Sequence, residues 1–161
     1  MMNVQELLAE VATAPVEKRA ITNHKALNEA YDYGSAFSRG MRIDLNGLTI
    51  LLISGTASID DQGRTVHVGD FRAQQRRTYD NISKLLASEG ATWHDIVRTT
   101  CYLRDIERDY QAFNEERTAF FKEQGLDPLP ASTGIQAILC RPDLLIEIEA
   151  IAMFHRESPE Q

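Results

Sequence analysis

The chain has 161 residues, a formal net charge of −7 and a pI near 5.1. That length suits a single domain with a sizeable core. An acidic chain has no basic field to attract phosphate backbones, so the composition argues against nucleic acid as a partner. No segment comes near the ~20 apolar residues of a membrane span, and residues 1–10 lack the basic start and apolar run of a signal peptide. With only two cysteines, the chain is expected to be cytoplasmic, without disulfides or contact with a membrane.

Residues 1–33 are predicted to form an extension ahead of the main body. Apolar residues recur at helical spacing within it, at Val4, Leu7, Leu8 and Val11. This spacing indicates a short amphipathic helix. The body is expected to be one domain over residues 34–155, followed by a polar C-terminal tail over 156–161.

The first half of the body is predicted to hold three strands and a long helix. Strands over 37–45 and 48–56 are joined by Asn46-Gly47, which is the strongest short hairpin signal. A short strand is expected at 65–68. The helix should begin near Asp70 and end before Gly90. Its inward face is predicted from the apolar spacing to be Phe71, Gln75, Thr78, Tyr79, Ile82, Leu85 and Leu86.

The second half is predicted to alternate strand, helix, strand and strand. The expected ranges are 97–103, 109–124, 132–141 and 144–154. In the first strand Val97 should share a face with Thr99, Cys101 and Leu103. In the helix, one stripe should contain Tyr110, Phe113, Phe120 and Phe121.

The last predicted strand carries two carboxylates on one face. Ile146, Ile148, Ala150, Ala152 and Phe154 alternate with Glu147, Glu149, Ile151 and Met153. The element order predicts an α+β fold: a mixed six-stranded sheet with two helices packed on one face. The opposite face mixes acids with apolar groups, which favours an oligomer whose subunits cover the apolar members. Periodicity alone leaves a dimer open.

Several blocks in one order carry a family resemblance. They are residues 34–40, 52–56, 95–105, Phe113-Asn114-Glu115, Phe120-Phe121 and 147–152. Together they resemble the Rid family of reactive-intermediate deaminases, also called the YjgF or L-PSP endoribonuclease family. The resemblance implies a chorismate-mutase-like fold and a homotrimer with small-molecule sites at the subunit interfaces. It also implies cofactor-free hydrolysis of enamines and imines to a keto compound and ammonia.

The site residues are transferred from the family by position. The resemblance makes Glu147 the acid that holds the attacking water and Ser54-Gly55 a pair that lines the pocket. Phe37 stands where the family usually has tyrosine, and Asn114 matches an asparagine that reaches towards the pocket of an adjacent subunit. On the strand at 132–141, Ser132, Thr133 and Gly134 are expected to line the pocket.

One departure from the family pattern concerns Ser132. The deaminases have Pro-Ala-Arg-Ser, and this chain has Pro130-Ala131-Ser132-Thr133. A substrate carboxylate placed there would lose a charge-assisted hydrogen bond, which weakens binding about tenfold. The sequence therefore predicts a divergent member that acts weakly on imines of small amino acids such as serine. Either Arg39 or Arg117 could replace the charge, although the simplest interpretation of Arg117 is a packed stem with its head in water.

Each of these assignments has a structural alternative. Glu147 could bond Arg98 or Arg141 across the sheet, and Asn114 could bond local backbone. The four histidines show no metal-ligand spacing, so no metal site is expected. Two function classes remain open: a cofactor-free imine or enamine hydrolase with a non-standard substrate, and a non-catalytic trimeric module that binds a small metabolite.

Overall fold

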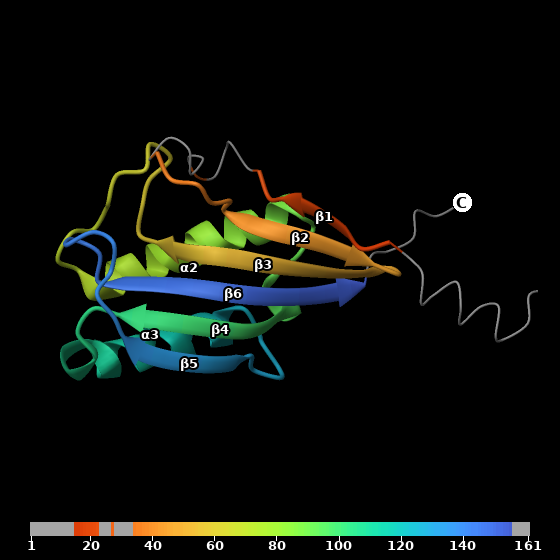
Figure 1. Cartoon of the computed structure of the whole chain (residues 1–161). Helices are drawn as coiled ribbons and strands as arrows, with labels where there is room; N and C mark the ends of the chain where they lie inside the picture. Colours follow the sequence, from red (N-terminus) through yellow and green to blue (C-terminus); the bar gives the residue numbers. More distant parts are fainter. Residues whose placement is uncertain (1–14, 23–26, 28–33, 156–161) are drawn as a thin grey trace, which may run out of the picture.

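The computed structural model describes residues 15–22, 27 and 34–155. Its elements are β1 (Glu17–Ala20), β2 (Gly40–Leu45), β3 (Leu48–Ala57), α2 (Phe71–Ser88), η2 (Trp93–Asp95), β4 (Ile96–Leu103), α3 (Ile106–Glu123), β5 (Ala131–Gln136) and β6 (Ile146–His155). The strands form one sheet in the order β1-β2-β3-β6-β4-β5, and α2 and α3 lie together on one side of it (Figure 1). Only β4 and β5 are parallel, so the sheet is mixed. The predicted α+β architecture is confirmed.

Local signals set the ends of the elements. Asn46 and Gly47 both have positive φ, at 49° and 81°, as a two-residue hairpin turn requires. Asp70 caps α2 by accepting a hydrogen bond from the backbone N–H of Ala73 at 3.0 Å. Beyond the other end of the helix, Gly90 has a φ of 76°. The hairpin and the limits of this helix were therefore correctly predicted.

The core lies between the helices and the sheet. All seven residues predicted to face inwards from α2 are buried. The helix-facing side chains of β6 are buried beneath them, at Ile146, Ile148, Ala150 and Ala152. Tyr79 of α2 stacks on Phe120 of α3 with ring centroids 4.4 Å apart. The alternation of β6 is confirmed, and it leaves Glu147 and Glu149 on the face without helices.

The sixth strand is not the one expected. Residues 65–68 form no strand, and only an isolated bridge joins Ile59 to Thr65. Instead β1, which lies within the stretch predicted as an extension, pairs with β2 along the sheet edge. Ile21 and Leu27 are buried in the main core, so the described part of that stretch belongs to the body. The predicted helix around Val4–Val11 and the tail at 156–161 lie outside the described residues.

Two side chains expected in the core are exposed. Val97 sits at an irregularity in the pairing of β4 with β6, between Ile96 and Arg98, so its side chain leaves the predicted face. Tyr110 lies near the start of α3, which begins at Ile106, and its ring is exposed. The strand predicted over 132–141 ends at Gln136, after which the chain continues as a loop.

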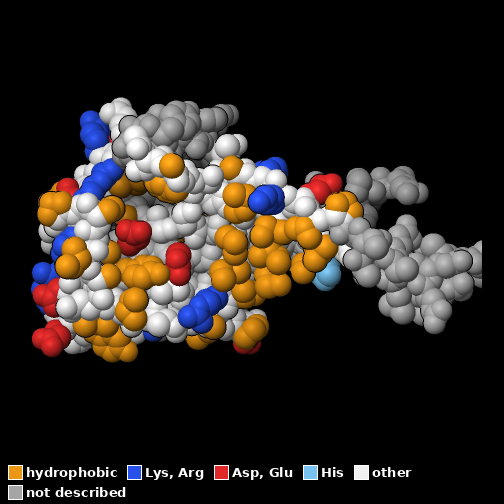
Figure 2. All heavy atoms as spheres, viewed as in Figure 1, with side chains coloured by type: hydrophobic (Ala, Val, Ile, Leu, Met, Phe, Trp, Pro, Cys, Tyr) orange, Lys and Arg blue, Asp and Glu red, His pale blue; other side chains and the backbone are white. Residues whose placement is uncertain are grey.

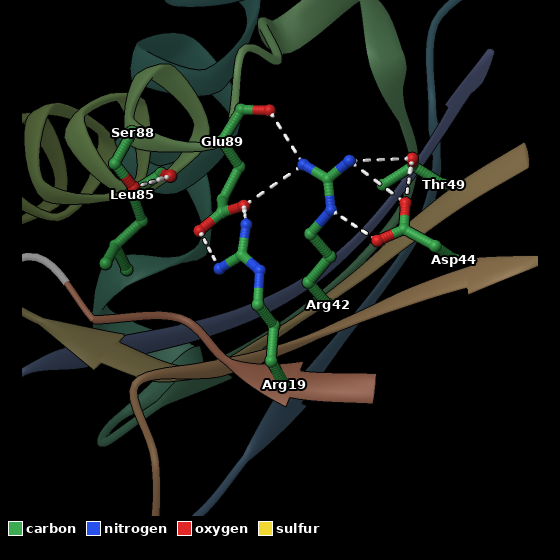
Figure 3. Close-up of polar contacts among 7 residues, drawn as sticks. All are labelled: Arg19, Arg42, Asp44, Thr49, Leu85, Ser88 and Glu89. Carbon is green, nitrogen blue, oxygen red and sulfur yellow. Dashed lines mark hydrogen bonds and ion pairs between the residues drawn. The ribbon is translucent and has the colours of Figure 1, made fainter. Parts of the chain in front are cut away.

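A buried ionic cluster joins the sheet edge to the end of α2 (Figure 3). Arg42 of β2 is only 6% exposed and donates to both Asp44 oxygens, at 2.8 and 2.9 Å, and to Thr49. It also donates to Oε2 of Glu89 at 3.1 Å. Arg19 of β1 binds the same carboxylate through two hydrogen bonds. Glu89 therefore links β1, β2 and the C-terminus of α2.

Among the described residues, no helix is both long enough and apolar enough to cross a membrane.

Candidate functional site

The site is built around an irregularity at the end of β3. The pairing of β3 with β6 shifts register between Ile53 and Thr56, at the position of Ser54 and Gly55. Such a bulge turns side chains away from the regular alternation. The hydroxyl of Ser54 donates to the carbonyl of Ser38 at 2.7 Å, and its backbone N–H donates to the carbonyl of Arg39 at 3.1 Å. These two bonds hold residues 38–39 beside the bulge.

Glu147 lies directly on Gly55. A Cβ atom added to Gly55 would be 2.0 Å from Oε1 of Glu147 and 3.0 Å from its Cδ. No other residue type leaves room for the carboxylate in this position. The glycine predicted to line the pocket therefore has a definite role, which is to let the acid of β6 lie against the backbone of β3.

The surroundings of Glu147 favour its protonated form. Partial burial and then the neighbouring charge of Glu149 raise the pKa of Glu147, and no hydrogen bond from the described residues offsets these two effects. Burial and Glu149 likewise raise the pKa of Tyr102, which lies opposite Glu147 on β4. The two arginines considered as partners of Glu147 bond elsewhere: Arg98 donates to Thr133 at 3.0 Å, and Arg141 donates to the carbonyl of Gly63 at 2.6 Å.

Four of the predicted site residues gather around one cavity of about 570 Å³. They are Phe37, Ser54, Gly55 and Glu147. Arg39 lines the same cavity and its guanidinium lies 5.5 Å from the centre of the Phe37 ring. A cavity of this size can hold a small organic molecule. An acid, a hydroxyl, an aromatic ring and a cation thus meet in a space large enough for a substrate.

Cys140 and Arg141 line this cavity and were not predicted to do so. Both lie in the loop between β5 and β6, which the sequence pattern placed partly in a longer strand. No spacing rule links a loop residue to a bulge that lies far earlier in the chain. The sequence therefore contains no local signal that Cys140 and Arg141 line the cavity.

The remaining predicted residues lie elsewhere on the chain. Ser132 lines a second cavity of about 510 Å³ between α3 and the loop before β5. Asn114 is nearby, where its amide donates to the carbonyl of Tyr110 at 3.0 Å, as the structural alternative expected. Gly134 faces the Phe113 ring, and a Cβ added to this glycine would lie 3.7 Å from the ring. The hydroxyl of Thr133 accepts its bond from Arg98. Of these four predicted residues, only Ser132 lines the second cavity, and none of them lines the cavity of Glu147.

The described residues contain no group of three or more His, Cys, Asp or Glu side chains arranged to hold a metal ion. Cys101 is buried, which raises the pKa of its thiol, and Cys140 is exposed. The polar side chains at the main cavity include the carboxyl of Glu147, the hydroxyl of Ser54, the guanidinium groups of Arg39 and Arg141, and the thiol of Cys140.

A family model, known sequences and solved structures all relate this chain to one family. The family model described as "Endoribonuclease L-PSP" matches residues 27–154. The 3-aminoacrylate deaminase RutC of Acinetobacter baylyi is 35% identical over 103 residues, which cover 64% of this chain and 78% of that protein. A RutC family protein of Pyrococcus abyssi is 30% identical over 135 residues, covering 84% and 96% respectively. The crystal structure of the YjgF gene product of E. coli superposes with a TM-score of 0.68 at 28% identity, covering 83% of this chain and 97% of that one. The chain therefore belongs to the endoribonuclease L-PSP family, which is also called the Rid or YjgF family.

Proposed function

We propose that the protein is a cofactor-free hydrolase that converts an imine or enamine to a carbonyl compound and ammonia. The observation that carries this proposal is the position of Glu147, half-buried against Gly55 in a cavity of about 570 Å³. An imine carbon is already electrophilic, so hydrolysis needs mainly a held water and a group that moves a proton. A carboxyl with a raised pKa suits that second task near neutral pH.

The reaction can be balanced with Glu147 as the proton carrier. Water adds to the imine carbon, a C–O bond forms, and the C–N π electrons move to nitrogen. The carboxylate takes one proton from the water and passes it to nitrogen. When the C–N bond of the resulting carbinolamine breaks, nitrogen leaves as ammonia after taking up the hydroxyl proton by the same route. Glu147 ends in its starting state, and one water is consumed for each ammonia released.

The relatives support this class of reaction. The relative from Acinetobacter baylyi is named a 3-aminoacrylate deaminase, and an aminoacrylate is an enamine. We propose a different substrate for this chain, one other than the imines of small amino acids. Ser132 stands where the resemblance places a carboxylate-binding arginine. Its hydroxyl is neutral, so it cannot make the charge-assisted hydrogen bonds by which a guanidinium holds a carboxylate.

We further propose that the protein works as a homotrimer with its sites between subunits. The face of the sheet without helices exposes apolar side chains that include Leu52, Met153 and Ile135. In Figure 2 hydrophobic side chains gather on this face beside acidic ones. A second copy would cover the apolar groups and leave the acids in clefts. It would also bring the cavity of Ser132 on one copy towards that of Glu147 on another.

Glu147→Gln tests the enzymatic proposal because it keeps the size of the side chain and removes its titratable proton. Product formation should be measured for wild type and variant on a panel of cyclic, aromatic and amino-acid-derived imines, against the uncatalysed rate. Wild-type turnover that the variant loses is expected. Glu149→Gln removes an equal charge from the same face and should keep turnover. Because Glu149 raises the pKa of Glu147, this variant should shift the pH dependence of the rate to lower pH.

Two results would contradict the proposal. If Glu147→Gln turns over a true substrate as fast as wild type, Glu147 is structural. If wild type hydrolyses no imine in the panel and still binds some of these molecules or their products, the protein is a metabolite-binding module.

A further inference from the structure

The cavity loop, residues 137–145 between β5 and β6, forms one side of the cavity of Glu147. It contributes three of the lining residues, which are Cys140, Arg141 and Leu144. In the described structure this loop contains no helix or strand, and its Ile138 side chain is 97% exposed. Such a segment keeps one shape only where its backbone groups find partners in neighbouring elements. The shape of the cavity therefore depends on what holds the loop.

Arg104, directly after β4, binds the cavity loop along its length. Its Nε donates to the carbonyl of Leu144 at 2.5 Å. Its Nη2 donates to the carbonyl of Leu139 at 3.4 Å and to that of Arg141. A single guanidinium thus contacts the loop near its beginning, its middle and its end. Because the donors of a guanidinium are fixed in one plane, the three carbonyls are held in a fixed relation to one another.

Gln74 of α2 holds the end of the cavity loop from the helix side. This side chain is completely buried. Its Nε2 donates to the carbonyl of Asp143 at 2.8 Å, and its Oε1 accepts from the backbone N–H of Leu145 at 2.8 Å. A small apolar cluster packs with the loop, and its buried members are Ala57, Leu139 and Leu144. Apolar packing has no preferred direction, so the hydrogen bonds decide how the loop backbone is turned.

The orientation of the loop backbone determines what the cavity presents to a ligand. The carbonyl of Arg141 points to Arg104, whereas the side chain of Arg141 lines the cavity. Without the guanidinium, partly buried carbonyls would lack a donor and would turn towards water. Cys140 and Arg141 would move with them, because they share the same backbone. Glu147 would stay in place, since β6 pairs with both β3 and β4 and the carboxylate lies against Gly55.

We propose that Arg104 is a positioning residue for the cavity of Glu147: it fixes the cavity loop, and the loop determines which substrates fit. This inference rests on the proposed imine hydrolysis, because it assigns the loop to substrate binding and Glu147 to the chemistry. Loss of Arg104 should therefore weaken the binding of substrate and transition state alike. Such a change raises KM and leaves kcat nearly unchanged.

Arg104→Met tests the proposal because it keeps an unbranched apolar stem and removes the guanidinium. Amide hydrogen exchange followed by NMR needs no substrate: the amides of Leu144 and Leu145 should exchange at least about tenfold faster, with α2 and α3 unchanged. On the imine that wild type hydrolyses fastest, KM should rise about tenfold and kcat should stay within about twofold. Arg72→Met is the matched control, since this guanidinium pairs with carboxylates of α3. It should match wild type in both measurements.

A second variant keeps the test decisive if Arg104→Met does not fold. Arg104→Lys retains the charge but has no planar fork, so it should show the same changes to a smaller extent.

Three results would contradict the proposal. Unchanged exchange of Leu144 and Leu145 would overturn the anchoring by Arg104. Faster exchange without a rise in KM would overturn the role of the loop in substrate binding. A fall in kcat at constant KM would mean that Arg104 acts on Glu147 instead. If wild type hydrolyses no imine, the hydrolase proposal itself fails, and the exchange measurement still supports or overturns the anchoring.

Discussion

Replacing Gly55 with alanine should remove activity while leaving the fold in place. The added Cβ would lie 2.0 Å from Oε1 of Glu147, and an ordinary carbon–oxygen contact needs about 3.3 Å. The carboxylate must therefore move by about 1.3 Å. Because the displaced atom is the end of a flexible side chain, the unfolding free energy should fall by no more than ~1 kcal/mol. A misplacement of ~1 Å can cost about 100-fold in rate, so kcat/KM should fall by roughly that factor.

The assay should combine imine hydrolysis with thermal unfolding on the same preparations. Gly134→Ala is the matched control, because its Cβ would lie 3.7 Å from the nearest atom of the Phe113 ring, which is an ordinary contact. This control should keep both its activity and its melting temperature. Wild-type activity in Gly55→Ala would refute the reasoning, since it would mean that the carboxylate need not lie against the backbone of β3. Loss of folding would also contradict it.

Three further predictions concern stability and assembly. The raised pKa of Glu147 means that its protonated form stabilises the fold at low pH and that this contribution is lost as the pH rises through the folded-state value. Glu147→Gln should therefore match wild type in urea midpoint near pH 4 and exceed it at pH 8, whereas a pH-independent difference would contradict this. Light scattering should show a trimer for wild type and a smaller species for Leu52→Asp, which charges an exposed apolar side chain of β3; a monomeric wild type would refute the trimer. Arg42→Met should lower the unfolding free energy by about 3–5 kcal/mol, because it removes a buried cation that pairs with both Asp44 and the buried Glu89. Arg64→Met, at an exposed pair, should change it by ~1 kcal/mol or less; equal melting temperatures would argue against a structural role for the cluster.

The parts of the fold that the sequence predicts are those with a short-range cause. The alternation of β6 is visible because every second side chain meets the helices. The limits of α2 follow from Asp70 and Gly90, whose effects act within a few residues. Strand β1 could not be predicted this way, because Glu17–Ala20 has an exposed, mostly polar pattern. It is held by pairing with β2 and by the bond of Arg19 to a carboxylate some seventy residues away.

The same distinction applies to the site. Nothing in the local pattern indicates that Glu147 meets Gly55, since the contact depends on a bulge in β3 and on the antiparallel pairing of β3 with β6. The family resemblance grouped the two residues, and the structure supplies the physical reason, which is the absence of a Cβ. Val97 shows the reverse case. The exposure of Val97 follows from a shift in the pairing of β4 with β6, which the alternation of a regular strand does not predict.

Ser132 and Arg117 show why a residue transferred by position can mislead about charge. The resemblance led us to expect a neutral rim at Ser132, because it places the arginine of the family pattern at that position. A ligand responds to where charged atoms lie, whichever residue carries them. Arg117 comes from α3 rather than from β5, and its Nη1 lies 3.1 Å from the Ser132 hydroxyl. An anion beside Ser132 would therefore meet a guanidinium that approaches from the helix.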